Sequence, residues 1–255
     1  MKMDKENILA TRVGKTIYRD KDKVYKVFDS QYSMSNILNE ALNHARVMES
    51  NVKVPKIYGV TEVDGKVAIV LQYIEGKTLA ELMKEHPEKI DQYLEQFVDL
   101  QMTIQSKKVP LLNRQYDKFY KKISDSNFDA TTKYDLHARL DSMKKHDKLC
   151  HGDFNPSNII ITKEHESYII DWAHVTQGNA SADVARTYLL FSLQGKEDLA
   201  DKYLNLFCKK SDTAKQYVQK WLPIVAASQS VKGHKEEIEF LSRWVDVVDL
   251  SLIHI

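Results

Sequence analysis

The residues best suited to chemistry lie in one short stretch and shortly after it. Residues 151–158 read HGDFNPSN, which places Asp153 five residues before Asn158, and Asp171 follows thirteen residues later. Mg²⁺ prefers oxygen ligands, and it usually takes one or two from protein beside phosphate oxygens and water. Phosphoryl transfer to a hydroxyl also needs a carboxylate that orients the attacking oxygen and accepts its proton. The residue types and spacing therefore indicate magnesium-assisted phosphoryl transfer.

The spacing is specific. A chain of 255 residues with 9 His, 21 Asp and 11 Asn is expected to contain the pattern His-x-Asp-x-x-x-x-Asn roughly 0.03 times by chance. Taken singly, a loop Asp or Asn is usually a turn former or a helix cap. Together the residues favour a functional site.

The elements before residue 76 are predicted mainly as strands, because short runs rich in Val, Ile and Tyr alternate with charged turns. Asp64-Gly65 is a strong hairpin signal between two of these runs. One helix is expected over 33–49, where apolar residues recur at helical spacing behind a serine cap. The expected strands cover 8–13, 16–19, 23–28, 56–63 and 66–73.

After Gly76 the pattern becomes helical, so we place a boundary there, between an N-terminal lobe (1–75) and a C-terminal lobe (76–255). The expected fold class is α+β, with an antiparallel five-stranded sheet and one helix, then a larger, mainly helical lobe. The helices are predicted from about residue 78, over 87–107 and 131–145, and as three or four segments over 180–250, with two short strands at 159–162 and 168–170.

Two motifs now carry a resemblance. The stretch 151–158 has the form H-G-D-x-x-x-x-N, and residues 170–172 read Ile-Asp-Trp. On these motifs the chain resembles the aminoglycoside phosphotransferase and choline kinase family, whose two-lobed fold is similar to that of protein kinases. The resemblance implies transfer of the γ-phosphate of ATP, with GTP left open, to a hydroxyl of an aminoglycoside, choline or similar alcohol. It implies that Asp153 is the base, that Asn158 and Asp171 hold Mg²⁺, and that His151 holds the loop by donating hydrogen bonds.

The N-terminal lobe carries the residues that a nucleotide site needs. Lys26 lies inside an apolar strand and Glu40 on the following helix, in the family's order, which implies a lysine on the phosphates and an acid that fixes it. Alone, Lys26 would be read as a residue on a solvated strand face and Glu40 as a solvated helix acid. The resemblance also implies that the backbone of Gln72 and Ile74 binds the adenine edge.

Two further positions follow from the resemblance. Gly14 is the one glycine of the loop expected to cover the phosphates, residues 11–16, where protein kinases have three. Asp183 resembles the family's helix-start aspartate that braces the catalytic loop, although an acid favoured by the helix dipole fits nearly as well.

The same comparison argues against a protein kinase. Gly152 stands where protein kinases have an arginine, no Ala-Pro-Glu follows Asp171, and only 172–179 separate that residue from the next helix. A kinase-like binding module without turnover remains the main alternative, and a protein kinase is the less favoured one.

The acceptor is expected to be a small molecule over the C-terminal lobe. A cationic acceptor would suit an acidic group near the end of the chain, although a solvated helix face explains that group better. Three tryptophans would suit an aromatic cage, although core packing explains them better. The acidic group comprises Glu236, Glu237, Glu239, Asp246 and Asp249, and the tryptophans are Trp172, Trp221 and Trp244.

Composition excludes several classes of protein. With 37 Lys+Arg against 36 Asp+Glu the net charge is +1, which gives no electrostatic footprint for nucleic acid or an anionic membrane surface. No apolar stretch is long enough to span a membrane. The first ten residues have no apolar signal core, and there are two cysteines, so we expect a reducing cytoplasm. The oligomeric state stays open.

Overall fold

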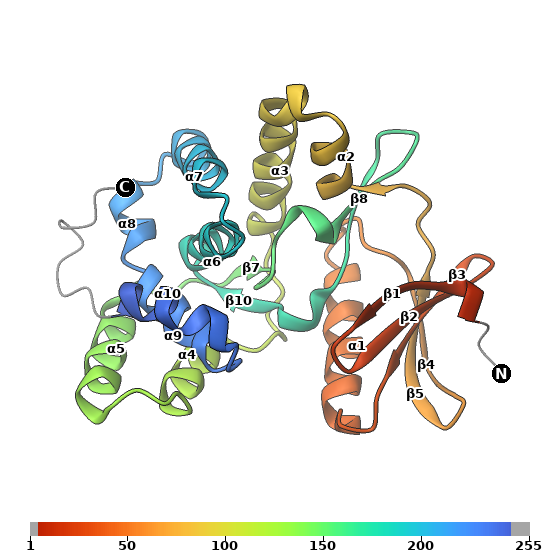
Figure 1. The fold of residues 1–255 in the computed structure, drawn as a ribbon, viewed down its shortest axis with the longest axis horizontal. Helices are drawn as coiled ribbons and strands as arrows, with labels where there is room; N and C mark the ends of the chain where they lie inside the picture. The colour runs from red at the N-terminus through yellow and green to blue at the C-terminus, as the bar shows by residue number, and fades with distance from the viewer. Residues whose placement is uncertain (1–4, 246–255) are drawn as a thin grey trace. The chain divides into compact units, whose positions relative to one another are not determined.

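The computed structural model describes residues 5–245 (Figure 1). This part of the chain divides into two compact units. The first unit takes residues 5–87 and Pro156–His174, and the second takes Glu88–Asn155 and 175–245. The first unit is thus built from two separate stretches of chain. The functional boundary at residues 75 and 76 stays a prediction.

The first unit contains the predicted five-stranded antiparallel sheet, in the order β1-β2-β3-β5-β4. The helix α1 (Met34–Met48) contacts β4 and β5, and Figure 1 shows it beside the sheet. The expected sheet and helix are therefore confirmed. The strands are β1 (Ile8–Arg12), β2 (Lys15–Asp20), β3 (Lys23–Phe28), β4 (Ile57–Val63) and β5 (Lys66–Gln72).

Local sequence explains these elements. The turn between β4 and β5 has positive φ at both Asp64 (50°) and Gly65 (75°), which is the backbone of a type I′ hairpin turn. Helix α1 starts at Ser33, whose side chain accepts a hydrogen bond from the Asn36 N–H at 3.3 Å. Its buried face includes Ile37 and packs with Phe28 of the sheet in one apolar cluster. Burial of this cluster fixes α1 against the sheet.

The rest of the first unit is a second, three-stranded sheet in the order β6-β8-β9. Its central and outer strands are β8 (Ile159–Ile161) and β9 (Ser167–Ile169), close to the predicted 159–162 and 168–170. The edge strand β6 (Lys77–Thr78) was not predicted, because two residues give no periodicity. Thr78 then caps α2 (Leu79–Glu85) in a capping box with Glu81.

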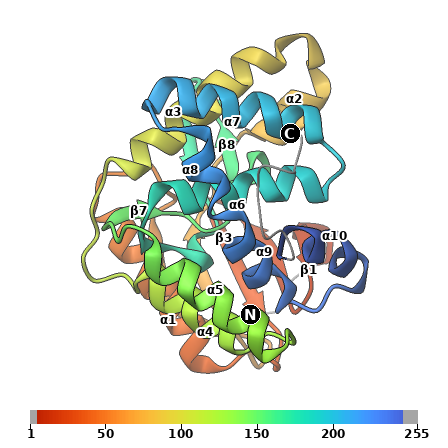
Figure 2. The same cartoon turned by 90° about the vertical axis from the view of Figure 1, so that its left-hand side faces the viewer.

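The second unit is mainly helical. Figure 2 shows α4, α5 and α9 side by side, in agreement with their contacts. The same unit contains a two-stranded antiparallel ladder of β7 (Lys148–Cys150) with β10 (Thr176–Gly178). The helices are α3 (Ile90–Gln105), α4 (Gln115–Ser124), α5 (Ala130–Ser142), α6 (Ala180–Leu193), α7 (Glu197–Ser211), α8 (Lys215–Gln219), α9 (Leu222–Ser230) and α10 (Lys235–Val245).

The sequence predictions for this unit differ from the structure at three places. The helix predicted over 87–107 begins as a separate 3-10 turn, Pro87–Lys89, before α3. Helix α4 was missed, because its sequence QYDKFYKKIS is short and mostly polar. The region from residue 180 holds five helices by residue 245 instead of three or four. The additional break after α7 comes at Asp212, whose left-handed backbone (φ 53°) ends that helix.

The three tryptophans are buried, with 1%, 3% and 9% of the surface of Trp172, Trp221 and Trp244 exposed. The interpretation as core residues is therefore confirmed. Within residues 5–245, none of the helices combines the length and the apolar character that a membrane span requires.

Gly76 offers a test of how tightly β6 approaches β8. A Cβ at this position would lie 2.3 Å from the Ile161 carbonyl oxygen. We expect Gly76→Ala to lower the free energy of unfolding by about 3 kcal/mol, because backbone must move to make room. Gly65→Ala is the control: its Cβ meets nothing within 4 Å and only its φ of 75° is unfavourable, so a loss of about 1 kcal/mol is expected. Equal losses in chemical denaturation would show that β6 and β8 separate easily.

Candidate active site

Lys26 on β3 forms the centre of the site in the first unit. The residue is only 6% exposed. Its ammonium donates to Glu40 on α1 and to the Asp171 Oδ1 at 2.8 Å. Burial alone would lower the pKa of Lys26, but Asp171 and Glu40 outweigh it and raise that pKa. The predicted lysine and its acid are therefore paired, and the solvated interpretations of both are wrong.

The neighbouring strands explain why a charge can lie here. In the strand register, Lys26 pairs with Ile17 of β2 on one side and with Ile69 of β5 on the other. Its neighbours across the sheet are therefore apolar. A buried ammonium is costly unless carboxylates pair with it. The sequence supplies one carboxylate from α1 and another from the turn after β9.

Asp171 and Asn158 are brought together by the β8–β9 hairpin. The Ile170 N–H donates to the Asn158 carbonyl at 2.9 Å, which extends the ladder by one step beyond Ile159 and Ile169. Asp171 then turns out of the strand with a left-handed φ of 62°. A non-glycine residue in this conformation is strained, and such strain clusters at functional sites.

Six of the predicted residues line one cavity of about 300 Å³ in the first unit. Its walls are largely apolar, with contributions from Ile17, Val24 and Leu71. An apolar cleft with a few charged groups is the usual form of a small-molecule site. The six residues are Lys26, Glu40, Gln72, Ile74, Asn158 and Asp171.

Lys15, which also lines this cavity, was missed as a site residue. Its ammonium lies 3.7 Å from the Asp171 Oδ2. Burial first, and Lys26 second, lower the pKa of Lys15. Its position directly after Gly14, in the loop expected to cover phosphates, was the available signal.

Gly14 serves the packing of its own loop. It has a φ of 73°, and a Cβ there would lie 2.2 Å from the Gln31 Nε2. Its carbonyl accepts a hydrogen bond from the Asp29 N–H at 2.9 Å. The loop therefore requires glycine for conformation and space. Gly14 does not line the cavity described above, and its role toward phosphates stays a prediction.

The segment predicted to bind adenine already uses some of its backbone groups. The Gln72 N–H donates to the Lys56 carbonyl at 2.8 Å, and the Tyr73 N–H donates to the Asp22 carbonyl at 2.8 Å. A contact from Gln72 to a base would therefore use its carbonyl oxygen. The adenine contacts of Gln72 and Ile74 stay predictions.

The donor set at Asp171 and Asn158 fits Mg²⁺. Residues 5–245 contain no group of three His, Cys, Asp or Glu side chains that could hold a metal. Magnesium bound with a nucleotide needs only one or two protein oxygens, because phosphates and water supply the others. The carboxylate and the amide oxygen meet this requirement, and Lys26 and Lys15 already hold positive charge against Asp171.

In the second unit, Asp183 holds the loop that carries Asp153. The Asp183 carboxylate accepts hydrogen bonds from the N–H of Gly152 at 2.7 Å and of His151 at 3.2 Å. Asp183 and His151 are both buried. The His151 Nδ1 accepts from the Asp153 N–H at 3.2 Å, so in this contact the ring is an acceptor and not the predicted donor. The bracing predicted for Asp183 is present.

Asp153 itself remains partly accessible, with 25% of its side chain exposed. Arg186 on α6 lies beside it, with 3.9 Å between the Arg186 Nη2 and the Asp153 Oδ1. The Asn155 side chain donates to the Asp153 Oδ2 at 3.4 Å. Arg186 was missed, because nothing in local periodicity distinguishes it from other helix cations.

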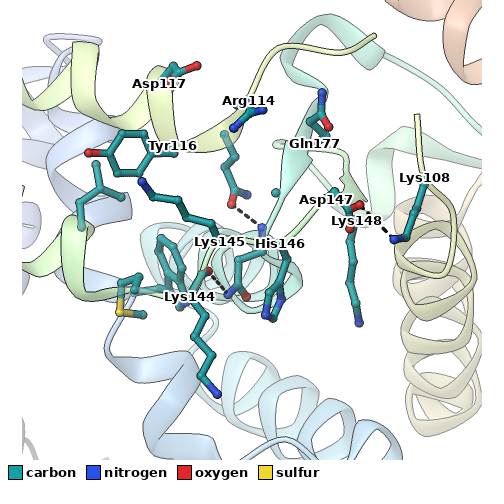
Figure 3. Close-up of a pocket in the computed structure, with 16 residues that line it drawn as sticks. Lys108, Arg114, Tyr116, Asp117, Lys144, Lys145, His146, Asp147, Lys148 and Gln177 are labelled. Atoms are coloured by element: carbon teal, nitrogen blue, oxygen red, sulfur yellow. Dashed lines mark hydrogen bonds and ion pairs between the residues drawn. The ribbon is translucent and has the colours of Figure 1, made fainter. Parts of the chain in front are cut away.

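A larger cavity of about 820 Å³ lies elsewhere in the second unit (Figure 3). Its wall includes the exposed run Lys144–Lys148, and the Lys145 ammonium lies 4.1 Å from the centre of the Tyr116 ring. None of the predicted site residues lines it. The volume of a cavity therefore does not identify where the predicted active site lies in this unit.

The acidic residues near the end of the chain divide into three groups. Glu236 and Glu239 on α10 are exposed, as the solvated interpretation expects. Glu237 is half-buried and accepts a hydrogen bond from the Gln229 Nε2 at 2.5 Å. Asp246 and Asp249 lie outside the described residues.

Comparison with known proteins identifies the family. Residues 12–217 match the model of the phosphotransferase enzyme family. The chain belongs to this family. The predicted resemblance is thereby confirmed, and so is the prediction that the protein is an enzyme. None of the curated proteins matches the sequence.

Solved structures of phosphotransferases share the fold at low sequence identity. A thermostable mutant of the aminoglycoside phosphotransferase APH(4)-Ia has a TM-score of 0.69 at 12% identity, over 94% of this chain and 92% of the other. Choline kinase LicA from Streptococcus pneumoniae has a TM-score of 0.65 at 15% identity, over 96% and 94%. A choline/ethanolamine kinase family protein from Mesorhizobium loti has a TM-score of 0.58 at 15% identity, over 92% and 83%. The predicted kinase-like fold is confirmed.

Some of these phosphotransferase structures contain ligands. APH(4)-Ia was crystallised in ternary complexes with hygromycin B and either AMP-PNP or ADP. LicA was crystallised with AMP.

The buried ion pairs of this phosphotransferase can be tested by removing Lys26. Lys26→Met leaves Glu40 and Asp171 facing each other without their cation, so we expect a loss of about 2 kcal/mol of unfolding free energy at pH 7. This expected loss is smaller than the loss of unfolding free energy when a fully buried ion pair is broken, because a third of Asp171 is exposed and Lys15 lies nearby.

The loss should diminish toward pH 4, because acid neutralises the negative charge that Lys26→Met leaves without its cation. Lys53→Met is the control, since it breaks an exposed pair with Glu166 and should change stability by less than about 1 kcal/mol. A pH-independent loss for Lys26→Met, measured by denaturation at both pH values, would contradict this electrostatic account.

Proposed function

We propose that this protein transfers the γ-phosphate of ATP, with Mg²⁺, to a hydroxyl group of a small molecule. The observation that carries the proposal is the set of ion pairs from Lys26 to Glu40 and Asp171, in a cavity that Asn158 also lines. A structural core has no use for an acid, a lysine and a strained aspartate at one cavity. Family membership supports the same reaction class.

The nucleotide is assigned to the cavity of the first unit. Lys26 is positioned to hold the α- and β-phosphates, and Glu40 keeps its ammonium in place. The AMP-PNP, ADP and AMP complexes of structurally similar phosphotransferases support an adenine nucleotide. The chemistry of these residues does not distinguish ATP from GTP, so ATP is proposed first. When bound at Asp171 and Asn158, Mg²⁺ would neutralise charge on the phosphates.

Asp153 is assigned as the base. Its carboxylate accepts the proton of the acceptor hydroxyl while that oxygen forms a bond to the γ-phosphorus, and the bond to the β–γ bridging oxygen breaks to release ADP. Asn158 follows Asp153 by five positions in the chain, so their Cα atoms are within about 18 Å of each other for any arrangement of the two units. The bracing of the loop by Asp183 preorganises the base.

A small-molecule acceptor is favoured over a protein. The hygromycin B complexes of APH(4)-Ia support it. In this chain, 172–179 consist of a short 3-10 turn and the strand β10 before α6 begins, which leaves no segment to dock a peptide. A binding module without turnover would not need a braced and accessible Asp153.

We also propose that the protein works in the cytoplasm, where ATP is available. Cys150 and Cys208 are both free thiols, which is typical of a reducing compartment.

The first test is a coupled ADP-release assay with Mg-ATP against a panel of small alcohols, run beside Asp153→Asn. Because the amide cannot accept the proton, we expect transfer to fall by at least about 10²-fold, while ADP affinity stays within about twofold. Asp147→Asn is the control, since Asp147 forms an exposed pair with Lys108 in the same unit. Full activity of Asp153→Asn would remove Asp153 from its role.

A second test addresses Asp171. In Asp171→Asn, ADP affinity should become nearly independent of Mg²⁺, because the charged metal ligand is lost. Calorimetry with and without Mg²⁺ separates this effect from a general loss caused by the broken pair with Lys26. Asp29→Asn, which alters an exposed pair with Lys66, should keep the magnesium dependence of wild type. Unchanged magnesium dependence in Asp171→Asn would show that the metal assignment is wrong.

A further inference from the structure

Cations surround Asp153 in the second unit. Lys118 and Lys122 lie one turn apart on α4, Arg186 lies on α6, and Lys232 lies between α9 and α10. Helix α9 contacts α4, α6 and α10. Asp153 interacts electrostatically with Lys118, Arg186 and Lys232, and Lys122 interacts with Lys118 and Arg186. We call Lys118, Lys122, Arg186 and Lys232 the basic cluster.

Arg186 is the best-defined member of the basic cluster. It is 9% exposed, and its Nη1 donates to the Gln229 Oε1 at 2.6 Å. Gln229 is itself held by Glu237, to which its Nε2 donates. The 3.9 Å separation from Asp153 is too long for a hydrogen bond. A guanidinium has five N–H donors, and within residues 5–245 Arg186 uses one of them. A deeply buried arginine is therefore fixed in place with most of its donors unused.

The pKa values of the four cations in the basic cluster are all lowered. Burial first, and neighbouring cations second, lower the pKa of Lys118 to about 7 and lower that of Lys122 as well. Burial followed by Arg186 lowers the pKa of Lys232, and burial lowers that of Arg186. By contrast, hydrogen bonds to Asp99 and Glu95 raise the pKa of Lys210 on the surface of the same unit. In the basic cluster, Asp153, Asp183 and Glu237 raise the pKa values of the cations by less than burial and the neighbouring cations lower them.

We propose that the acceptor carries an anionic group, a phosphate or a carboxylate, which the basic cluster binds while Asp153 receives the hydroxyl proton. A bound anion would take the unused donors of Arg186 and remove the repulsion among the lysines. The same cations would repel an aminoglycoside or choline, so the acceptor class differs from those named for the similar structures. This inference rests on the proposed function, because it assigns Asp153 as the base.

The experiment compares acceptors that differ mainly in charge. ADP release is measured with glycerol 3-phosphate and glycerate as anions, glycerol as the neutral compound, and ethanolamine and choline as cations. We expect kcat/KM to be at least about tenfold higher for an anion than for the others. The phosphate and carboxylate arms distinguish the two kinds of anionic group. In parallel, calorimetry measures binding of inorganic phosphate and citrate to the protein with Mg-ADP.

The variants Lys122→Gln and Arg186→Gln test the basic cluster directly. Both should raise KM for the anion, or its dissociation constant, by about tenfold or more, with less change in kcat. Arg186→Lys should recover part of the affinity for the anion, because lysine restores the positive charge but not the planar guanidinium group. Lys121→Gln is the matched control, since Lys121 is next in sequence and its ammonium pairs with Asp125 on the exposed face of α4.

The protonation of Lys118 gives a further readout. Lys122 on its own helix, Arg186 and Asp183 on α6, and Asp153 face it. Because its pKa is about 7, anion affinity should fall as pH rises from 7 to 9. Lys118→Arg should flatten this dependence, because a guanidinium stays charged over that range.

The outcomes separate this inference from the proposed function. Transfer only to neutral or cationic alcohols would overturn the anionic acceptor and leave the phosphotransferase standing. Anion binding that Lys122→Gln loses and Lys121→Gln keeps, without transfer to any alcohol, would support the anion site and count against the proposed reaction. If the protein neither binds an anion nor transfers phosphate to one, the inference is overturned.

Discussion

The first unit depends on the need to neutralise one buried ammonium. Lys26 lies on a strand between apolar neighbours, and its buried charge is stable only because Glu40 and Asp171 form ion pairs with it. The two carboxylates come from α1 and from a hairpin 145 residues further along the chain. The ion pairs therefore tie together strand, helix and hairpin, and they fix the positions of the charged groups that line the cavity of this unit. Stability and chemistry use the same contacts here.

The two units place their charges differently, although the whole chain carries only +1. In the first unit, cations and carboxylates meet in pairs, which suits a nucleotide that arrives with its own metal. In the second unit, Asp153 lies 3.9 Å from Arg186 and interacts electrostatically with Lys118. These are the cations to which we assign the anionic group of the acceptor.

The sequence was most informative where chemistry or periodicity is local. The strand Lys23–Phe28, the helix after Ser33 and the turn at Asp64 were predicted correctly, because their signals lie within a few residues. The motif around Asp153 was found from spacing alone. Lys15 and Arg186 were missed because a cation on a strand or helix looks solvated until distant elements bury it. The short strands β6, β7 and β10 were missed because their partners, and not their own patterns, make them strands.

The two-segment construction of the first unit has a consequence for folding during synthesis. Pro156–His174 complete this unit, but 68 residues of the second unit separate them from its first part. Closing a loop of that length costs about 4 kcal/mol of chain entropy. The nascent sheet must also wait for the ribosome to release residue 174 before Lys26 meets Asp171. Until then Lys26 can pair only with Glu40 in an incomplete core, which makes this stage the natural point for chaperone engagement.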